Sequence, residues 1–304
     1  MKIIPKRIVL SRKGFDKSAG GFASPIFSDG RMVSLPIPEN AKYPSVTLRF
    51  NDLGSSDDRG AGISSIIDRL PRPFDVSSKV HLDPDLRPAL RPKNGDDPLG
   101  YFGQESRAMT ELQSHGVCDP SNDSLFLFYG WFKGVREEHD GRLRYHSARR
   151  GELQTHSQHV IWGWLQIEEK PKWIPTGELD PSLLHIDYHP HIEGRARRKN
   201  NYIFKGRERL SFVENVAGAG VFSHLDRDLR LTCENEINKR SSWVVPPFLR
   251  SCARGRIAKG RWTTDGSVHR VEYSGFGQEF IFDTEGHEEA ASQWLATIFT
   301  KLQS

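Results

Sequence analysis

Several polar segments of this 304-residue chain carry side chains that could do chemistry. The first follows the apolar run 8–10 and contains Arg12, Lys13 and Asp16 on a loop that is rich in glycine. Such a loop, leaving a buried strand, can bind an anion through free backbone N–H groups and nearby cations. We therefore expect Arg12 and Lys13 to contact a phosphate or a developing negative charge. The alternative is that both are ordinary surface charges and that Asp16 forms a turn.

The second segment, residues 81–86, reads His-Leu-Asp-Pro-Asp-Leu. Its carboxylates, Asp83 and Asp85, stand two residues apart beside His81, and this set could transfer protons or bind a metal. Asp-Pro-Asp is also a common turn sequence. The segment therefore supports both a catalytic and a structural interpretation.

The third segment contains His185, Asp187, His189 and His191, which would share one face of an extended chain. Imidazole and carboxylate groups are metal ligands. However, Pro190 interrupts the extended pattern, and no usual zinc spacing such as H-E-x-x-H is present. We therefore predict no metal site and favour proton transfer or hydrogen bonding for His191. The sequence identifies no cofactor.

Two further segments combine basic and aromatic side chains. Residues 195–209 contain seven basic residues together with Tyr202 and Phe204, and residues 250–270 contain six basic residues around Trp262. Basic side chains neutralise phosphates and aromatic rings stack on bases, so both segments suit a nucleic-acid groove. The alternative is two solvated loops balanced by nearby acids. The predicted nucleic-acid contacts are Arg195, Arg197, Arg198, Lys199, Arg254 and Arg256.

A pair of apolar runs should form the core that positions these groups. Residues 125–132 and 159–167 are short and rich in β-branched and aromatic residues, which predicts neighbouring buried strands. Gly130 and Gly163 interrupt the runs, which indicates a bend, a bulge or the close approach of a ligand or another backbone. The charged insert 133–158 should be a solvated loop or a loose hairpin arm.

The remaining pattern predicts short elements around this pair. We expect strands at 8–10 and 277–283, a turn at Asp29-Gly30, and helices at 63–70, 107–114 and 288–302. Together these elements predict a single α+β domain over residues 1–304, with a mainly antiparallel mixed sheet and a C-terminal helix.

Composition limits the class of protein. The chain has 43 Lys+Arg and 39 Asp+Glu, a net charge of +4, so contacts with nucleic acid must come from local patches. Three cysteines without C-x-x-C spacing argue against a disulfide framework and a cysteine zinc site. Because no apolar run approaches the length of a membrane span, and 1–5 lack a signal-peptide core, we expect no membrane association and a cytoplasmic location. The oligomeric state is not indicated.

Motifs along most of the chain carry a family resemblance. They lie at 10–16, 20–21, 24–26, 34–38, 81–86, 102–104, 125–132, 163–166, 189–191, 218–222 and 277–280. In these motifs the chain resembles the family called nucleotide modification associated domain, type three. The resemblance implies a setting in phage and bacterial systems that make or handle modified DNA bases. Position by position it marks as candidates Arg12, Lys13, Asp16, His81, Asp83, Asp85, Gln104, Trp131, His191, Gln278 and Glu279, without assigning their roles.

The order of the two aromatic strands and the charged arm is also similar to the paired barrel strands of PUA-like domains, several of which read modified bases. This similarity implies a partly closed barrel, with Trp131, Trp162 and Trp164 as candidates for stacking on a flipped base. Core packing is the alternative role for these rings.

Two functional hypotheses follow. The chain is an enzyme that acts on a modified base or nucleotide, or a non-catalytic reader of modified bases in DNA or RNA. Ionisable groups at the mouth of the cleft would favour the enzyme, and an aromatic cage without them would favour the reader.

Dispersed polar motifs with no local capping role are most simply explained by convergence on one pocket. We expect Arg12 and Lys13 to bind negative charge, Asp16 or His191 to move protons, and Gln104 to read a base edge. The catalytic candidates are Asp16, His81, Asp83, His191 and Glu279. The substrate-binding candidates are Arg12, Lys13, Gln104, Trp131, Trp164 and Gln278, and the expected partner is nucleic acid, with DNA preferred, or a nucleotide.

Overall fold

A computed structural model describes residues 2–54, 62–92, 97–149, 151–235, 239–266, 268–272 and 279–302. The strands are β1 (Arg7–Arg12), β2 (Ser24–Ile26), β3 (Ile37–Pro38), β4 (Val80–His81), β5 (Tyr101–Gln104), β6 (Leu125–Glu137), β7 (Leu143–Tyr145), β8 (Gln158–Gln166), β9 (Lys172–Trp173), β10 (Tyr202–Lys205), β11 (Ala219–Val221), β12 (Ser242–Val244), β13 (Ala253–Arg254), β14 (Arg261–Asp265), β15 (Val268–Glu272) and β16 (Glu279–Asp283). The helices are α1 (Ile63–Arg69), α2 (Ser106–Ser114), α3 (Pro190–Glu193), α4 (Leu249–Cys252) and α5 (Glu288–Phe299).

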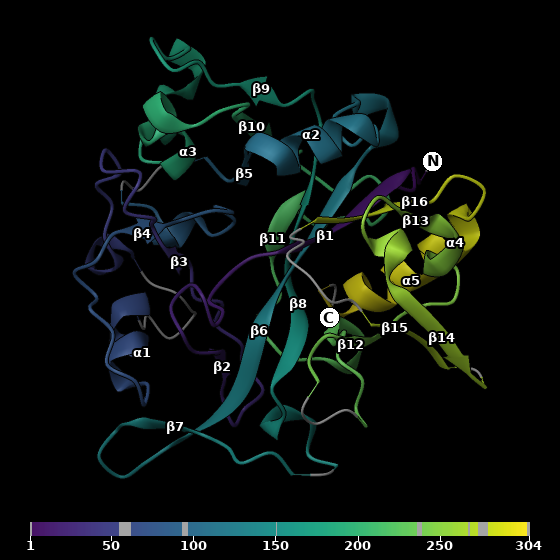
Figure 1. Ribbon diagram of the computed structural model, residues 1–304, viewed down its shortest axis with the longest axis horizontal. Helices are drawn as coiled ribbons and strands as arrows, with labels where there is room; N and C mark the ends of the chain where they lie inside the picture. The colour runs from purple at the N-terminus through teal and green to yellow at the C-terminus, as the bar shows by residue number, and fades with distance from the viewer. Residues whose placement is uncertain are drawn as a thin grey trace.

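The predicted aromatic strand pair forms the centre of the molecule. β6 and β8 pair antiparallel, and a bulge lies between Phe128 and Tyr129, so the prediction for 125–132 and 159–167 is confirmed. Every residue of β8, and residues 125–130 of β6, is buried. Beyond the core, β6 continues into the insert and pairs with β7, which makes the hairpin arm seen at the bottom of Figure 1.

The main sheet has eight strands and mixed directions. Six follow the order β11-β8-β6-β1-β16-β13, and β2 and β7 add to β6. β1 and β2 run parallel to β6, whereas the other neighbours in this sheet are antiparallel. The path has two ends, β11 and β13, so the described strands form no closed barrel, and the PUA-like barrel stays a prediction. The α+β class is confirmed.

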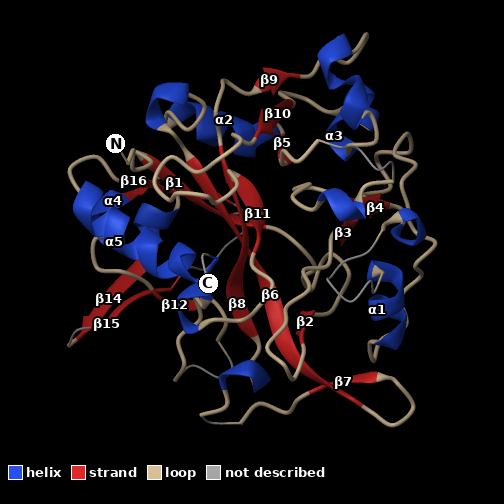
Figure 2. Cartoon of the chain, turned by 180° about the vertical axis from the view of Figure 1, so that it is seen from behind, coloured by secondary structure: helices blue, strands red, loops and turns tan. Residues whose placement is uncertain are grey.

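The three predicted helices are present as α1, α2 and α5, with bounds within a few residues of those expected. The turn at Asp29-Gly30 is also present, because the Phe27 and Arg31 backbones pair across it. α4 and α5 lie at one side of the main sheet, and α1 and α3 lie at the other, as Figure 2 shows from behind. Local sequence signals were therefore sufficient for these elements.

The segment 185–191 is not extended, so the condition under which its four polar side chains would share one face is not met. Residues Pro181–Ile186 form a 3-10 helix and Pro190–Glu193 form α3. Asp180 caps the first helix and His189 caps the second, each followed directly by proline at the first helical position. A capping side chain followed by proline favours a helix start. The four side chains therefore do not share the face that an extended chain would give them.

Two apolar cores lie on either side of β5. Phe102 packs into the core of the main sheet with β6, β8 and α5. Its neighbour Tyr101 packs into a second core with α1, β4 and the residues around α3. Successive strand residues point to opposite faces, so β5 belongs to both cores. The prediction of a single domain over 1–304 stays a prediction.

Within the described residues, no helix has both the length and the apolar content needed to cross a membrane.

A polar pocket around Asp83

A cavity of about 720 Å³ opens between the two cores, beyond the end of β1 and beside β4, β5 and α3. Its polar and aromatic lining includes Arg12, Lys13, Asp16, Glu39, Lys42, Tyr43, His81, Asp83, Gln104, Glu105, His191 and Arg198. The structure therefore brings together the predicted N-terminal loop, the His81 turn, Gln104 and His191. It also adds Arg198 from the basic run.

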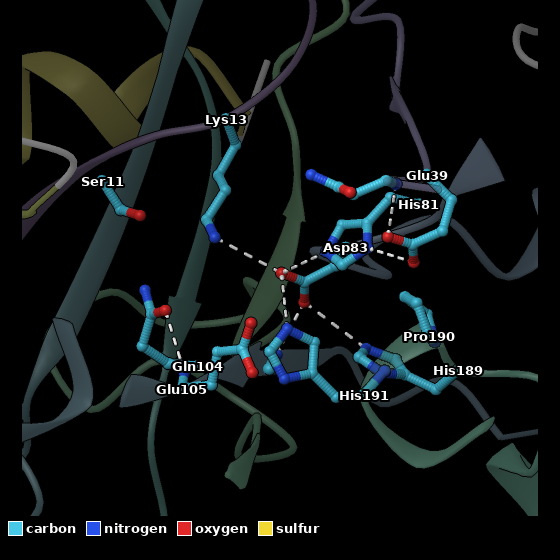
Figure 3. A network of polar contacts seen from close by, with 12 residues as sticks. Ser11, Lys13, Glu39, His81, Asp83, Gln104, Glu105, His189, Pro190 and His191 are labelled. Carbon is cyan, nitrogen blue, oxygen red and sulfur yellow. Dashed lines mark hydrogen bonds and ion pairs between the residues drawn. The ribbon is translucent and has the colours of Figure 1, made fainter. Parts of the chain in front are cut away.

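Asp83 is the centre of this pocket, and its side chain has no exposed surface. The backbone N–H of Gly103 donates to Asp83 Oδ1 over 2.6 Å, and Lys13 Nζ donates to Oδ2 over 3.3 Å. Three histidines complete the shell, with Nε2 of His189 3.4 Å from Oδ1 and Nε2 of His81 and His191 3.7 and 3.9 Å from Oδ2. Figure 3 shows the contacts of Lys13 and the three histidines converging on one carboxylate.

The surroundings decide the charge of Asp83. Burial alone would raise its pKa, but the charge of Lys13 and the contacts with His189 and His81 outweigh burial. The pKa of Asp83 therefore lies well below its ordinary value. A buried carboxylate that stays ionised can accept protons or hold a cation.

His81 lies between two carboxylates. Its Nδ1 is 2.8 Å from Glu39 Oε2, and its Nε2 faces Asp83. Burial alone would lower the pKa of His81, but the contacts with Asp83 and Glu39 outweigh it and raise the pKa. Glu39 in turn contacts Arg198 over 3.3 Å. A carboxylate on each nitrogen orients the ring.

His191 is held in one tautomer by Asn201. The Asn201 side-chain amide donates to the His191 carbonyl oxygen over 2.7 Å, which turns its own Oδ1 toward His191 Nδ1, also at 2.7 Å. Nδ1 must then carry the proton, and Nε2 presents a lone pair to the cavity. Burial and the nearby charge of Arg198 hold the pKa of His191 well below its ordinary value.

His189 has the opposite tautomer. Its Nδ1 accepts the backbone N–H of His191, so its proton lies on Nε2 and points toward Asp83. The His-Pro-His sequence therefore supplies a donor to Asp83 and an acceptor to the pocket. Both follow from the short helix α3 that Pro190 begins.

Two glycines make this arrangement possible. A Cβ on Gly103 would lie 2.2 Å from the His191 ring, so only glycine lets that ring pack against β5. A Cβ on Gly130 would lie 2.7 Å from the Lys13 carbonyl oxygen. Gly130 therefore marks the close approach of another backbone, which is one of the interpretations that the sequence left open.

Arg198 closes the pocket on the side of Tyr43. Its guanidinium contacts Glu39 and Glu105, at 3.3 and 3.0 Å, and stacks 3.7 Å from the centroid of the Tyr43 ring. The residue is only 4% exposed, so it is not part of a solvated basic surface. Arg198 therefore belongs to the wall of the pocket, and its predicted contact with nucleic acid stays a prediction.

The N-terminal loop supplies the rim. Arg12 and Asp16 form an ion pair of 3.5 Å, and both side chains are partly exposed. Asp16 Oδ1 accepts the backbone N–H groups of Ser18 and Ala19, so Asp16 lines the pocket and also forms the turn that was its alternative role.

Gln104 lines the pocket and connects it to Glu279, which lies behind it. Glu279 Oε1 accepts from Gln104 Nε2 over 2.6 Å and from Ser11 Oγ over 3.1 Å, and burial raises the pKa of Glu279. Glu279 does not line the cavity. Gln104 Oε1 accepts the Glu105 backbone N–H and keeps a second lone pair for a ligand.

The predicted tryptophans lie elsewhere. Trp164 is buried, donates to the Ala217 carbonyl oxygen and packs on Phe222 and Phe299. Trp131 donates to Ser157 and lies under Arg240. Neither lines the pocket, whereas Tyr43 does. Core packing, the alternative role, describes Trp164.

The other candidates are dispersed. Arg195 donates to the carbonyl oxygens of Gly177 and Ile192, and Arg197 and Lys199 are exposed. Arg254 of β13, the edge strand of the main sheet, pairs with Asp283, and Arg256 is exposed two residues after this strand. Figure 1 shows α3 and β14 at opposite sides of the molecule, so the two basic regions form no common surface. Gln278 lies outside the described residues.

Sequence reasoning missed several pocket residues. Glu39, Glu105, Lys42 and Tyr43 stand in no motif that indicates chemistry, and Asn201 lies inside the basic run 195–209 without a signal of its own. His189 could have been found from its position before Pro190, since histidine there can cap a helix. Among the residues that the structure describes, His81, Asp83 and His191 form the group whose ligand atoms are close enough to hold a metal ion.

Comparison with known families gives one match. The model of the family described as nucleotide modification associated domain 3 matches residues 7–283. Comparisons with curated proteins and with solved structures found no match.

Proposed function

This chain belongs to the family described as nucleotide modification associated domain 3, and we propose that it is an enzyme that binds a nucleotide in the pocket around Asp83 and acts on its base. The expected substrate is a nucleotide within DNA. The proposal joins the family's association with nucleotide modification to the chemistry of the pocket.

The observation that carries the proposal is the convergence of donors and acceptors on Asp83. His189 presents a proton, His191 presents a lone pair, and both ring nitrogens lie within 4 Å of the same carboxylate. His191 and Asp83 line the inner end of the cavity, and the His189 donor lies behind Asp83. An acceptor and an ionised carboxylate, with a donor held against that carboxylate, are groups that general acid–base chemistry uses. A pocket used only for binding has no need of them.

The rim suits the phosphate of a nucleotide. Arg12 is 28% exposed at its side chain, and its ion pair with Asp16 is long enough to be exchanged for a phosphate. Lys42 lies on the other side of the mouth, with its ammonium over the Tyr43 ring. A volume of about 720 Å³ is within the usual range for pockets that bind small molecules. The base would then point inward, toward Asp83.

The reader hypothesis has less support. Tyr43 is the single phenolic or indole ring among the described residues that line the pocket, and Arg198 already covers one of its faces. A reader that stacks a flipped base needs apolar faces on both sides of that base. The pocket is lined instead by ionisable groups.

The basic residues near the rim support a polymeric substrate. Arg197 donates to the carbonyl oxygen of Lys42 over 3.3 Å, so the exposed part of 195–199 adjoins the mouth of the pocket. Cations in that position can neutralise the phosphates that flank a bound nucleotide. Arg254 and Arg256 lie on the opposite side and take no part in this proposal.

Mass spectrometry of nucleosides tests the enzymatic proposal. Modified and unmodified phage DNA is incubated with the wild-type protein and with Asp83→Asn, and the digested nucleosides are compared. We expect peaks to appear or disappear with the wild type and to stay unchanged with Asp83→Asn. Equal activity of both proteins would exclude the Asp83 pocket as the reacting site. Binding of a modified nucleotide in the pocket without any chemical change would favour the reader.

A charge-reversal pair tests the polymer. Arg197→Glu should weaken binding to single-stranded DNA and reduce the salt dependence of that binding by about one phosphate contact. Arg256→Glu, an equally exposed change on the far side, is the control. Equal weakening by both variants would contradict a DNA path beside the pocket mouth.

A further inference from the structure

Three ligand atoms face one another inside the pocket. Nε2 of His81, Oδ2 of Asp83 and Nε2 of His191 all lie within 4.8 Å of one another, and all three residues are buried. They come from β4, the turn that follows it, and α3, which is far from both in the sequence. Ligand atoms around a transition metal lie about 3.0 to 3.5 Å apart. The two pairs at 3.7 and 3.9 Å need to close by about half an ångström around an ion, and the third pair, the two imidazole nitrogens, lies within 4.8 Å.

In each of these residues, the polar atom that points away from the cluster already has a partner. Glu39 contacts Nδ1 of His81, Asn201 Oδ1 accepts from Nδ1 of His191, and the Gly103 N–H donates to the other oxygen of Asp83. A histidine that binds a metal through one ring nitrogen typically donates a hydrogen bond from its other ring N–H to a carboxylate or a carbonyl oxygen. These outer contacts turn three atoms inward, of which the two imidazole nitrogens face the cavity and Oδ2 of Asp83 accepts from Lys13. This is the pattern of a metal centre and is not needed for a hydrogen-bonded core.

We propose that His81, Asp83 and His191 bind a divalent transition-metal ion such as Zn²⁺ or Fe²⁺. Two imidazoles and one carboxylate suit these ions, whereas Mg²⁺ and Ca²⁺ take oxygen ligands. With three protein ligands, the remaining coordination positions face the cavity. The inference deepens the proposed function, and it rests on that function for the idea that the pocket handles a nucleotide.

Lys13 is the competitor for this position. Its ammonium lies 3.3 Å from Asp83 Oδ2, which shows that this oxygen attracts a cation. The lysine reaches the site across the Phe102 ring, with Nζ 4.5 Å from the ring centroid, and its side chain can withdraw into the open cavity. An ion bound by two further nitrogen ligands would replace it.

This set combines two residues of the segment 81–86, for which the sequence left a metal open, with one residue of the segment 185–191. The extended run 185–191 would have offered His185, Asp187, His189 and His191. In the structure His185 contacts Tyr101 and Asp97 instead, and His189 directs its proton toward Asp83. Only His191 of that run belongs to the proposed site.

Cobalt titration tests the site on the full chain without any nucleotide. Protein treated with a chelator is titrated with Co²⁺. The visible absorption bands of bound Co²⁺ report its nitrogen and oxygen ligands. We expect bands that saturate at one ion per chain and that Zn²⁺ abolishes. Asp83→Asn and His191→Gln should lose them, and His185→Gln, a histidine of the same segment outside the cluster, should keep them.

Thermal unfolding provides a second readout that does not depend on the variants. Zn²⁺ at a hundredfold excess over its Kd should raise the Tm of the wild type by on the order of 5 °C, and Mg²⁺ at the same concentration should not. Absence of both the bands and the shift in the wild-type protein would overturn the proposal. Equal bands in His191→Gln and the wild type, or an equal shift with Mg²⁺, would also overturn it.

The two proposals can fail separately. Nucleoside conversion that persists in chelator-treated protein would overturn the metal and leave the enzymatic proposal standing. Saturable Co²⁺ binding in a protein that neither binds nor changes a nucleotide would support the metal and overturn the enzymatic proposal.

Discussion

Asp83 and Asp85 stand two residues apart, both with fully buried side chains, and they have opposite surroundings. Asp85 receives Arg91 Nε on both oxygens, at 3.1 and 2.9 Å, and the Tyr188 hydroxyl at 2.7 Å. Arg91 itself donates onward to the Leu99 carbonyl oxygen. Asp83 instead faces a cavity and is surrounded by groups that can exchange protons or bind ligands.

The comparison separates a structural carboxylate from a functional one. A buried charge is stable when one fixed partner and a few hydrogen bonds satisfy it, as at Asp85. At Asp83 three imidazoles and an ammonium share one carboxylate, and the buried Nε2 of His189 has no hydrogen bond of good geometry. Such incomplete pairing beside a cavity indicates a site that is completed by a ligand.

The largest expected difference is between Asp85→Asn and Asp83→Asn. Asp85→Asn leaves the buried Arg91 without its counterion and should lower the free energy of unfolding by about 3 to 5 kcal/mol. Asp83→Asn should lower it less, because Lys13 can move into the cavity, but should reduce turnover by about 10² to 10⁴-fold. Denaturant unfolding and nucleoside turnover, measured on the same preparations, check both values.

A reversed result would contradict the assignment. If Asp83→Asn unfolded the protein while Asp85→Asn abolished turnover in a fully folded chain, Asp83 would be the structural carboxylate and Asp85 the functional one.

The second prediction concerns Gly103, which seats His191 against β5. In Gly103→Ala the new methyl group displaces the His191 ring, and a misplacement of about 1 Å can reduce turnover on the order of 100-fold. Overpacking should cost about 1 to 3 kcal/mol of stability. Gly177→Ala is the matched control, since a Cβ there meets nothing within 4 Å. Unchanged turnover in Gly103→Ala would show that His191 is not required.

The third prediction concerns the tautomer of His191. Asn201→Ala removes the acceptor of Nδ1, so the proton can move to Nε2 and the lone pair no longer faces the cavity. Loss of such an orienting partner typically costs about 10-fold in activity or metal affinity. The tautomer is measured by the ¹⁵N NMR chemical shifts of the His191 ring. Asn51→Ala, a substitution at an exposed position, is the control. An unchanged tautomer would show that other contacts hold the ring.

The smallest effect is expected at Glu279, the carboxylate behind the pocket. Its pKa in the folded protein is raised by burial, so its stabilising contribution is present below its ordinary pKa and is lost as the pH rises through the raised value. The unfolding free energy of the wild type, relative to Glu279→Gln, should therefore fall as the pH rises from 4 to 8. Turnover should change little. If the difference in unfolding free energy between the wild type and Glu279→Gln did not depend on pH, burial would not raise the pKa of Glu279 in the folded protein.

The sequence was sufficient where local signals decide the structure. β6, β8, α1 and α5 follow from apolar content and periodicity, and the converging segments follow from polar residues placed after strands and turns. It was insufficient where distant partners decide. Arg198 looks like any other arginine of the basic run until Glu39 and Glu105 surround it. Trp164 could face a ligand or the core, and only its packing on Phe299 distinguishes these roles.

A crystal structure grown with a 5′-deoxymononucleotide would test the central claim most directly. We predict density in the cavity around Asp83, with the phosphate between Arg12 and Lys42 and the base directed toward His191. A nucleotide bound elsewhere, such as beside Arg254 and Arg256, with the Asp83 cavity filled only by water, would contradict the account.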